Sequence, residues 1–194
     1  MRKLKLQMQL SVDGYISGPG GEMDWMVWSW DNELKNYVNG ITKSVDQILL
    51  GRKLAEEFIP HWAAKAADKE EPNAEFARKI ASTPKIVFSK TLETFADKNT
   101  TVISDANPYL INQIKNQQGN DIIVYGGGSF VSSLIEQGLI DEYHLFMNPV
   151  VLGKGRPIFN SMEEQLKLQL IRAKPFACGI VVLAYRYIAG THVR

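Results

Sequence analysis

The sequence predicts an α/β protein built on a parallel sheet, with two antiparallel strands at its C-terminal edge. The main observation is the stretch 121–151, which reads as strand, glycine turn, helix and strand. This order is a βαβ unit, and such a unit implies parallel strands. The second observation is a pair of strand candidates at 166–171 and 180–188, which suit an antiparallel edge.

The size and composition of the chain fit a soluble globular protein. Its 194 residues are 45% hydrophobic and 22% charged, enough for one domain with a substantial core. The net charge of +1 creates no field that would attract nucleic acid or an anionic membrane. Cys178 is the only cysteine and the three histidines show no ligand spacing, so we expect no metal site. A cytoplasmic protein is the default expectation.

The N-terminal part contains two strand candidates, each followed by a helix candidate. Residues 3–12 alternate apolar and polar side chains, which predicts a strand with one apolar face. The polar side chains of this strand are Lys5, Gln7, Gln9 and Ser11. Asp31 is expected to cap a helix that extends to about Val38. The run 47–50 predicts a second strand, and the helix that starts directly after it is expected to end at Pro60.

The middle of the chain alternates helix and strand candidates. Phe76 and Ile80 lie four residues apart in a helix candidate at 73–81, whereas 63–71 reads as an exposed excursion. A further helix is expected to have Asn107 as its N-cap and Pro108 as its first residue. The strand candidates of this region are 85–88, 101–104, 122–125 and 142–151.

Gly126, Gly127 and Gly128 form the turn of the βαβ unit, with Ser129 as the expected N-cap of the next helix. Glycines let the backbone approach a ligand closely, and the start of a helix offers unpaired N–H groups and a positive dipole end. An anion, most simply a phosphate, fits there. A tight turn that binds nothing is the alternative, because a glycine turn alone is a weak signal.

Three strand candidates end in small or basic residues suited to phosphate, in the segments 48–53, 86–91 and 123–129. In an open parallel sheet ligands bind outside the carboxyl ends of the strands, so three such ends side by side suggest a ligand with several phosphates. The basic residues that would bind a phosphate monoester are Arg52, Lys53 and Lys90. This pattern favours NADPH over NADH, whose ribose would want an acidic residue. The fingerprint G-x-G-x-x-G and the P-loop are both absent.

These segments resemble the reductase domain at the C-terminal end of bacterial riboflavin biosynthesis proteins, especially its small stand-alone members, which are related in fold to dihydrofolate reductase. The resemblance is carried by SVDGYISG (11–18), ILLGRK (48–53) with Trp62 downstream, PKIVFSKTL (84–92), IIVYGGGSFVSSLIEQGLIDE (122–142) and PVVLGKGRPIF (149–159). It spans nearly the whole chain and implies a single reductase domain, 1–194. The implied fold is dihydrofolate reductase-like, a mostly parallel central sheet with helices on both faces and an antiparallel C-terminal edge.

The resemblance implies NADPH as cofactor and assigns residues to it. The expected contacts on the 2′-phosphate side are Gly51, Arg52, Lys53, Ser89, Lys90 and Thr91. The expected contacts to the pyrophosphate and the nicotinamide are Gly126, Gly127, Gly128, Ser129 and Phe130. Tyr125 is placed between cofactor and substrate, and Asp13 begins a loop expected to close over the nicotinamide, so both are substrate-binding candidates.

Two departures from the family pattern concern the site. The family usually reads G-R-K-T-Y after the second strand, whereas this chain has Leu54 and Ala55 and so lacks a threonine hydroxyl near the cofactor. Dihydrofolate reductases carry a carboxylate on the first helix that assists protonation. Asp31 or Glu33 lies near that position and is the catalytic candidate, with a simple N-cap as the alternative for Asp31.

The sequence therefore predicts an NADPH-dependent reductase of the riboflavin-biosynthesis type, similar to 5-amino-6-(5-phosphoribosylamino)uracil reductase and acting on a pyrimidine or related heterocycle. A dihydrofolate reductase proper is the alternative within the same class. A non-catalytic dinucleotide-binding protein is the alternative from another class. Related domains commonly form homodimers, which the apolar C-terminal strand would allow.

Overall fold

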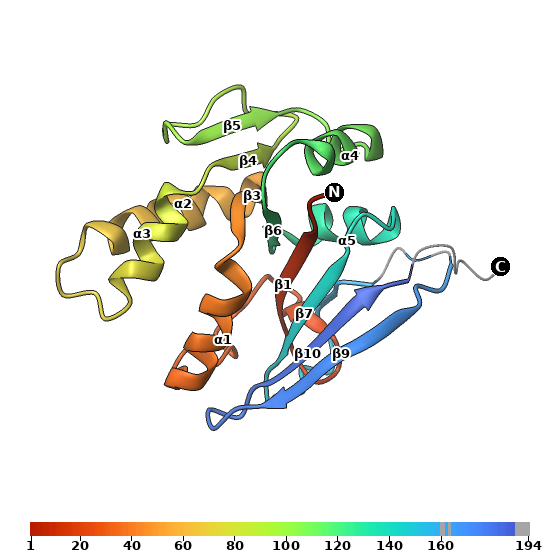
Figure 1. Ribbon diagram of the computed structural model, residues 1–194. Coiled ribbons are helices and arrows are strands. Elements are labelled where there is room, and N and C mark those ends of the chain that lie inside the picture. Colours follow the sequence, from red (N-terminus) through yellow and green to blue (C-terminus); the bar gives the residue numbers. More distant parts are fainter. Residues whose placement is uncertain (160–161, 163, 189–194) are drawn as a thin grey trace.

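The computed structural model describes residues 1–159, 162 and 164–188, which fold around a central eight-stranded sheet (Figure 1). Along the chain, the strands of this sheet are β1 (Leu4–Leu10), β3 (Val45–Gly51), β4 (Lys85–Phe88), β5 (Thr100–Ile103), β6 (Asp121–Tyr125), β7 (Glu142–Met147), β9 (Leu168–Pro175) and β10 (Val181–Tyr187). A separate two-stranded sheet consists of β2 (Tyr15–Ser17) and β8 (Arg156–Pro157).

The order of strands across the central sheet is β5-β4-β3-β6-β1-β7-β10-β9. All neighbours from β5 to β7 pair in parallel, and β10 pairs antiparallel with both β7 and β9. Parallel neighbours need long crossover connections, and helices supply these except between β4 and β5, which a loop joins. The predicted parallel sheet with an antiparallel C-terminal edge is confirmed.

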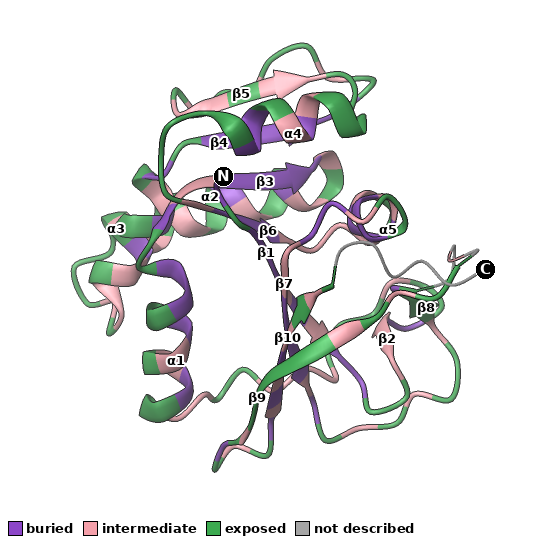
Figure 2. Cartoon of the chain, turned by 45° about the vertical axis from the view of Figure 1, so that its right-hand side comes forward, coloured by how far each residue is buried: buried purple, intermediate pink, exposed green. Residues whose placement is uncertain are grey.

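Helices cover both faces of the sheet, so the inner strands are buried from both sides (Figure 2). Within the described residues they are α1 (Asn32–Thr42), α2 (Arg52–Ala67), α3 (Ala74–Ser82), α4 (Pro108–Asn116) and α5 (Gly128–Glu136). None of the helices in this part of the chain is long and apolar enough to cross a membrane.

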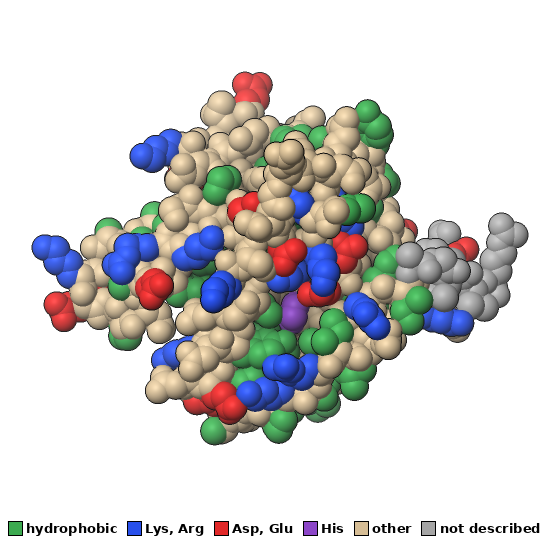
Figure 3. Space-filling model, viewed as in Figure 1, with side chains coloured by type: hydrophobic (Ala, Val, Ile, Leu, Met, Phe, Trp, Pro, Cys, Tyr) green, Lys and Arg blue, Asp and Glu red, His purple; other side chains and the backbone are tan. Residues whose placement is uncertain are grey.

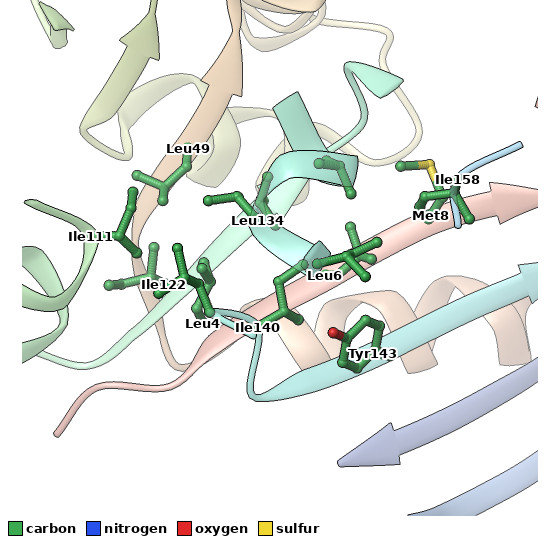
Figure 4. Close-up of a cluster of buried hydrophobic side chains, with 14 of the residues drawn as sticks. Leu4, Leu6, Met8, Leu49, Ile111, Ile122, Leu134, Ile140, Tyr143 and Ile158 are labelled. Atoms are coloured by element: carbon green, nitrogen blue, oxygen red, sulfur yellow. The ribbon is translucent and has the colours of Figure 1, made fainter. Parts of the chain in front are cut away.

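One face of the sheet carries the largest apolar cluster, which α4 and α5 cover (Figure 4). The alternating apolar residues of β1 enter this cluster, as the period of two in the sequence predicts. Side chains from the strands and the two helices fill it, among them Leu4, Leu6, Met8, Leu49, Ile111, Ile122, Leu134 and Ile140. Burial of these side chains is the main source of stabilisation on this face.

The opposite face carries two separate apolar clusters, one on each side of β1. In the first, α2 and α3 pack on β3, β4 and β6, and its buried members include Ile48, Leu50, Ile59, Ile80 and Ile123. In the second, α1 packs on β7 and β10, and its buried members include Leu34, Val38, Phe146 and Val182. The polar face of β1 therefore lies between two apolar clusters.

Ion pairs join neighbouring elements near the amino ends of the parallel strands. Lys3 pairs with Glu142 at 2.6 Å, and Lys5 pairs with Asp121 at 2.7 Å. Acidic and basic side chains lie next to one another around the middle of the molecule in Figure 3. Because these charges already have partners within the protein, the amino edge of the sheet is a poor place for a charged ligand.

The caps predicted for α1 and α4 are confirmed. The Asp31 carboxylate accepts a hydrogen bond from the Leu34 N–H at 2.8 Å. The Asn107 side chain accepts one from the Leu110 N–H at 2.9 Å, with Pro108 as the first helical residue. Each cap satisfies one of the N–H groups that a helix start leaves unpaired.

The expectation that Pro60 ends its helix is wrong. Helix α2 continues through Pro60 to Ala67, so the first part of the segment expected to be an exposed excursion is helical. A proline inside a helix removes one hydrogen bond and costs about 3 kcal/mol relative to alanine. The flanking residues offset this cost, because Ile59 is 5% exposed and Phe58 and Trp62 pack against the same cluster.

Candidate functional site

The carboxyl ends of β4, β3 and β6 lie side by side, since these strands are consecutive and parallel in the sheet. Two of them approach through glycines. A Cβ atom added to Gly127 would lie only 3.6 Å from the Cα of Gly51. The predicted convergence of three segments far apart in the sequence is therefore confirmed as geometry, at the edge where ligands of open parallel sheets bind.

The turn after β6 depends on glycine. Gly126 and Gly127 have φ values of +26° and +81°, a region that side chains disfavour. Gly127 is the N-cap of α5, and Ser129, the predicted N-cap, lies inside the first turn of the helix instead. That expectation was wrong because Gly127, in its left-handed conformation, ends the turn after β6, and the helix begins at the next residue. The first N–H groups of α5 therefore follow directly on the glycines, where an anion is favoured.

A pocket of about 540 Å³ opens beside this turn. One wall is aromatic, with the rings of Phe88 and Phe130 stacked at a centroid distance of 4.9 Å. The lining residues that the sequence predicted are Ser89, Lys90, Ser129 and Phe130. The pocket thus combines a stacked aromatic wall, one lysine and the first turn of α5.

The segment after β4 is held in a tight turn by its own serine. Ser89 is buried, and its hydroxyl accepts hydrogen bonds from the N–H groups of Thr91 at 3.2 Å and Leu92 at 2.9 Å. Lys90 and Thr91 are exposed at the surface of this turn. Ser89 therefore fixes the backbone, while Lys90 is the residue that offers charge.

Arg52 and Lys53 are the first two residues of α2 and directly follow Gly51, but they do not line the pocket. Arg52 forms an exposed ion pair with Glu56 at 2.8 Å, and Lys53 is exposed. Two cations in the first turn of a helix oppose its dipole. Glu56 offsets part of this conflict, although exposed pairs contribute little.

The two substrate-binding candidates differ in their surroundings. The Asp13 carboxylate accepts hydrogen bonds from the N–H groups of Leu152 and Gly153, at 3.1 and 2.7 Å, and so ties the loop after β1 to the loop after β7. Its hydrogen bond with Ser11, and then those backbone bonds, lower the pKa of Asp13. Tyr125 is the last residue of β6, and its ring lies 5.1 Å from that of Phe58. Burial raises the pKa of its hydroxyl.

The structure places the two catalytic candidates on the other side of β1. Asp31 caps α1 and also accepts a hydrogen bond from the Cys178 N–H at 3.2 Å, in the hairpin between β9 and β10. These backbone bonds, first that from Leu34, lower the pKa of Asp31. Glu33 forms an ion pair with Lys174 of β9 at 2.7 Å. Cys178 and Lys174, which bind the two candidates, belong to the β9–β10 hairpin. Strands β1 and β7 lie between this hairpin and β6, the strand that leads into the glycine turn.

Several residues of the pocket escaped the sequence analysis. They follow β5, lie on α5 or cap its end, and they are Ser104, Asp105, Ala106, Asn107, Ser133 and Gln137. Asp105 accepts a hydrogen bond from the Asn107 side chain at 3.0 Å. The carboxyl end of β5 lies at the same edge of the sheet as those of the other three parallel strands, where ligands bind. The strand candidate at 101–104 could therefore have pointed to these residues. Within the described residues, no group of three or more acidic, histidine or cysteine side chains is arranged to hold a metal ion.

Comparisons with known proteins agree with this geometry. The Bacillus subtilis protein YyaP is 31% identical over 188 residues, with 96% of this chain and 95% of that protein covered. A deaminase and 5-amino-6-(5-phosphoribosylamino)uracil reductase from Thermotoga maritima has a TM-score of 0.68 at 17% identity, covering 96% of this chain and 57% of that one. Dihydrofolate reductase from Enterococcus faecalis, complexed with NADP(H), has a TM-score of 0.60 at 14% identity, covering 95% and 96%.

The similarity in sequence extends over almost the whole chain. A family model described as the RibD C-terminal domain matches residues 2–182. The solved structures, at identities of 17% and 14%, show the fold that this family shares with dihydrofolate reductase. The predicted family and the predicted fold are both confirmed: the chain belongs to the RibD C-terminal domain family.

Proposed function

We propose that the protein is an NADPH-dependent reductase that acts on a pyrimidine or a related heterocycle, in the manner of 5-amino-6-(5-phosphoribosylamino)uracil reductase. The observation that carries the proposal is the close approach of Gly51 and Gly127 beside a pocket that contains Lys90. Membership of a reductase family and the likeness to the Thermotoga maritima enzyme support the reaction class.

The residues of the pocket fit a dinucleotide in shape. A Cβ at Gly51 would lie 3.1 Å from the Cβ of Phe130, so a side chain there would crowd the wall of the pocket. The glycines of the turn leave the backbone N–H groups of α5 accessible to a pyrophosphate. Lys90 and, at the start of α2, Arg52 would supply charge for a 2′-phosphate. Among the described residues that line the pocket, Asp105 is the one carboxylate, and it opposes a phosphate at its end of the pocket.

The chain's own contribution to the chemistry is binding, orientation and proton supply. A nicotinamide cofactor, when bound, supplies the hydride. The glycine turn and Phe130 would hold it at the carboxyl edge of the sheet, with Tyr125 between it and the substrate. A proton must also reach the product. Asp31 and Glu33 stay predictions for this role, and Asp13 stays a prediction for substrate binding.

The proposal is tested by the fluorescence of NADPH titrated with the protein, followed by assays of NADPH oxidation. Oxidation with the ribosylaminopyrimidine phosphate supports the proposed function. Oxidation with dihydrofolate alone would favour the second candidate, a dihydrofolate reductase, which the Enterococcus faecalis enzyme makes worth testing. Binding without oxidation of either compound would favour a non-catalytic dinucleotide-binding protein, and absence of NADPH binding would refute the proposal.

The proposed assembly is a cytoplasmic homodimer. The C-terminal strand β10, which was expected to offer the edge, lies inside the sheet, and β9 is at the edge instead. Strand β9 exposes apolar side chains, with Leu170 and Ile171 at 53% and 51% exposure. Exposed strand edges of this kind pair with other chains. Light scattering coupled to size-exclusion chromatography, on the full chain and on Leu170→Lys, tests whether a dimer forms through β9. A monomeric wild-type protein would contradict the proposal.

A further inference from the structure

Strand β1 carries a polar face, which is unusual for an inner strand of a parallel sheet. Strand β1 lies in the interior of the sheet, between β6 and β7. Inner strands of parallel sheets are covered on both faces and are normally apolar on both. Here Lys5, Gln7 and Gln9 face the side that carries α1 and α2, along the seam between two apolar clusters. Packing of the core therefore gives no reason for polar side chains at these three positions.

Two of these three polar residues are satisfied within the protein. Lys5 pairs with Asp121 at 2.7 Å, and Gln9 accepts a hydrogen bond from the Asn148 side chain at 2.8 Å. Gln7, between them, differs. Its Oε1 atom is buried and has no hydrogen-bond partner among the described residues. An acceptor left in this state costs about 1–3 kcal/mol.

Gln7 is part of a row of such atoms. In the register of the sheet, Gln7 lies opposite Tyr125 on one side and His144 on the other, so the three share a face. Within the described part of the chain, four buried side-chain polar atoms lack a hydrogen-bond partner, and three of them belong to this row: Gln7 Oε1, the Tyr125 hydroxyl and His144 Nε2. Unsatisfied groups in native proteins are few, and a cluster of them points to a ligand.

The row is adjacent to the glycine turn. Strand β6 ends at Tyr125, whereas β1 continues through Leu10 and β7 through Met147. The carboxyl edge of the sheet is therefore stepped, because β1 and β7 extend beyond β6. The row lies level with the end of β6. Gln7 and Tyr125 are only partly buried as residues, so the row lies close to the surface beside the turn.

The neighbours of the two ring nitrogens of His144 indicate which nitrogen carries the proton. The Tyr37 hydroxyl of α1 lies 2.9 Å from Nδ1, and a carboxylate oxygen of Glu142 lies 3.8 Å from Nε2. A carboxylate favours the tautomer that carries the proton on Nε2, so Tyr37 donates to Nδ1. The Nε2 proton of His144 then faces Glu142, and the row presents an acceptor at Gln7 beside a donor at Tyr125.

We infer that Gln7, with Tyr125, binds the edge of an uncharged planar heterocycle that bears N–H and C=O groups, such as a pyrimidinedione. A neutral amide both donates and accepts, so it matches a heterocycle edge that alternates donor and acceptor. An ionised phosphate or carboxylate would place a second acceptor against Gln7 Oε1, with no proton to donate to it. The inference rests on the proposed function and assigns its substrate recognition to a residue of β1.

The test compares Gln7→Leu with Gln47→Leu. Gln47 is a partly buried glutamine of β3 on the opposite face of the sheet, away from the row, and so controls for the loss of a strand glutamine. The probe is 5,6-diaminouracil, titrated by calorimetry with and without NADPH. Gln7→Leu should weaken probe binding about tenfold, which is 1.4 kcal/mol, and leave NADPH affinity unchanged. Gln47→Leu should bind the probe like the wild type.

Thermal unfolding separates recognition from a structural role. Because Gln7→Leu removes an unsatisfied acceptor from the seam, its Tm should equal or exceed that of the wild type, whereas a structural glutamine would lower Tm when replaced. Tyr125→Phe removes only a hydroxyl and should weaken probe binding severalfold with Tm retained. Wild-type affinity in both variants, or no probe binding by the wild type in either condition, would overturn the inference. Probe binding that depends on Gln7 in a protein that ignores NADPH would refute the proposed function alone.

Discussion

Alanine in place of Gly127 should separate the cost of backbone strain from the loss of cofactor binding. The residue has φ +81° and ψ 74°, and a left-handed conformation costs an L-residue about 1–2 kcal/mol. The new Cβ would lie 3.6 Å from the Gly51 Cα, an ordinary contact, so crowding adds little. The lower entropy of the unfolded chain offsets about 0.4–1 kcal/mol. The net loss in unfolding free energy is therefore about 1 kcal/mol, or about 2–4 °C in Tm.

The same methyl group should affect binding much more than stability. It would project into the narrow space between β3 and β6, where the backbone is expected to approach the pyrophosphate. We expect NADPH affinity to fall at least tenfold, about 1.4 kcal/mol, in a fluorescence titration.

Gly153→Ala is the matched control for this experiment. Gly153 has φ +73°, and an added Cβ would meet no atom of the described residues within 4 Å. It lies outside the pocket, so the variant carries the same strain without the methyl group in the site. The two variants should lose similar Tm, and only Gly127→Ala should lose NADPH affinity. Equal NADPH affinity in both would refute the reasoning.

Four further changes test the site and the fold. Arg52→Ala should weaken binding of NADPH but not of NADH, with stability changed by under about 1 kcal/mol because its ion pair is exposed; an equal loss for both nucleotides would contradict the 2′-phosphate assignment. Asp105→Asn should tighten NADPH binding about threefold at low salt by removing a negative charge from the pocket; unchanged affinity would argue against a phosphate there. His144 and then Lys3 lower the pKa of Glu142 from 4.5 to about 2, so this carboxylate stabilises the fold above pH 4.5 and loses that effect as the pH falls towards 2. Glu142→Gln should flatten this part of the curve of Tm against pH, and an unaltered curve would contradict the shift. Pro60→Ala should raise the unfolding free energy by about 1–2 kcal/mol, since alanine restores a helical N–H; a denaturation midpoint at or below that of the wild type would count against it.

The strand pattern was predictable because each strand carries a local signal. The alternation at 3–12 and the apolar runs before Gly51, Ser89 and Gly126 identify four of the parallel strands. The ends of the last three lie side by side in the sheet, as expected. The glycine turn was also predictable, because only glycine accommodates its backbone. These features depend on a few neighbouring residues and so are visible in the sequence.

Other features depend on contacts between distant segments, which the sequence does not display. Pro60 is tolerated because the residues around it are buried against α3 and β3. The surroundings of Asp31 follow from the β9–β10 hairpin, which places the Cys178 N–H beside the α1 cap. The significance of Gln7 is likewise hidden, since a polar residue on an alternating strand normally faces water. Only the two flanking clusters show that it does not.

The step at the carboxyl edge, where β6 stops and β1 and β7 run on to Leu10 and Met147, has a stereochemical consequence. Three residues of strand rise about 10 Å, enough to shield one side of an aromatic ring completely. A nicotinamide lodged against such a wall would expose a single prochiral hydrogen to its acceptor. Reduction with NADPH deuterated on one side or the other would then transfer the label from one isotopomer and retain it in the other.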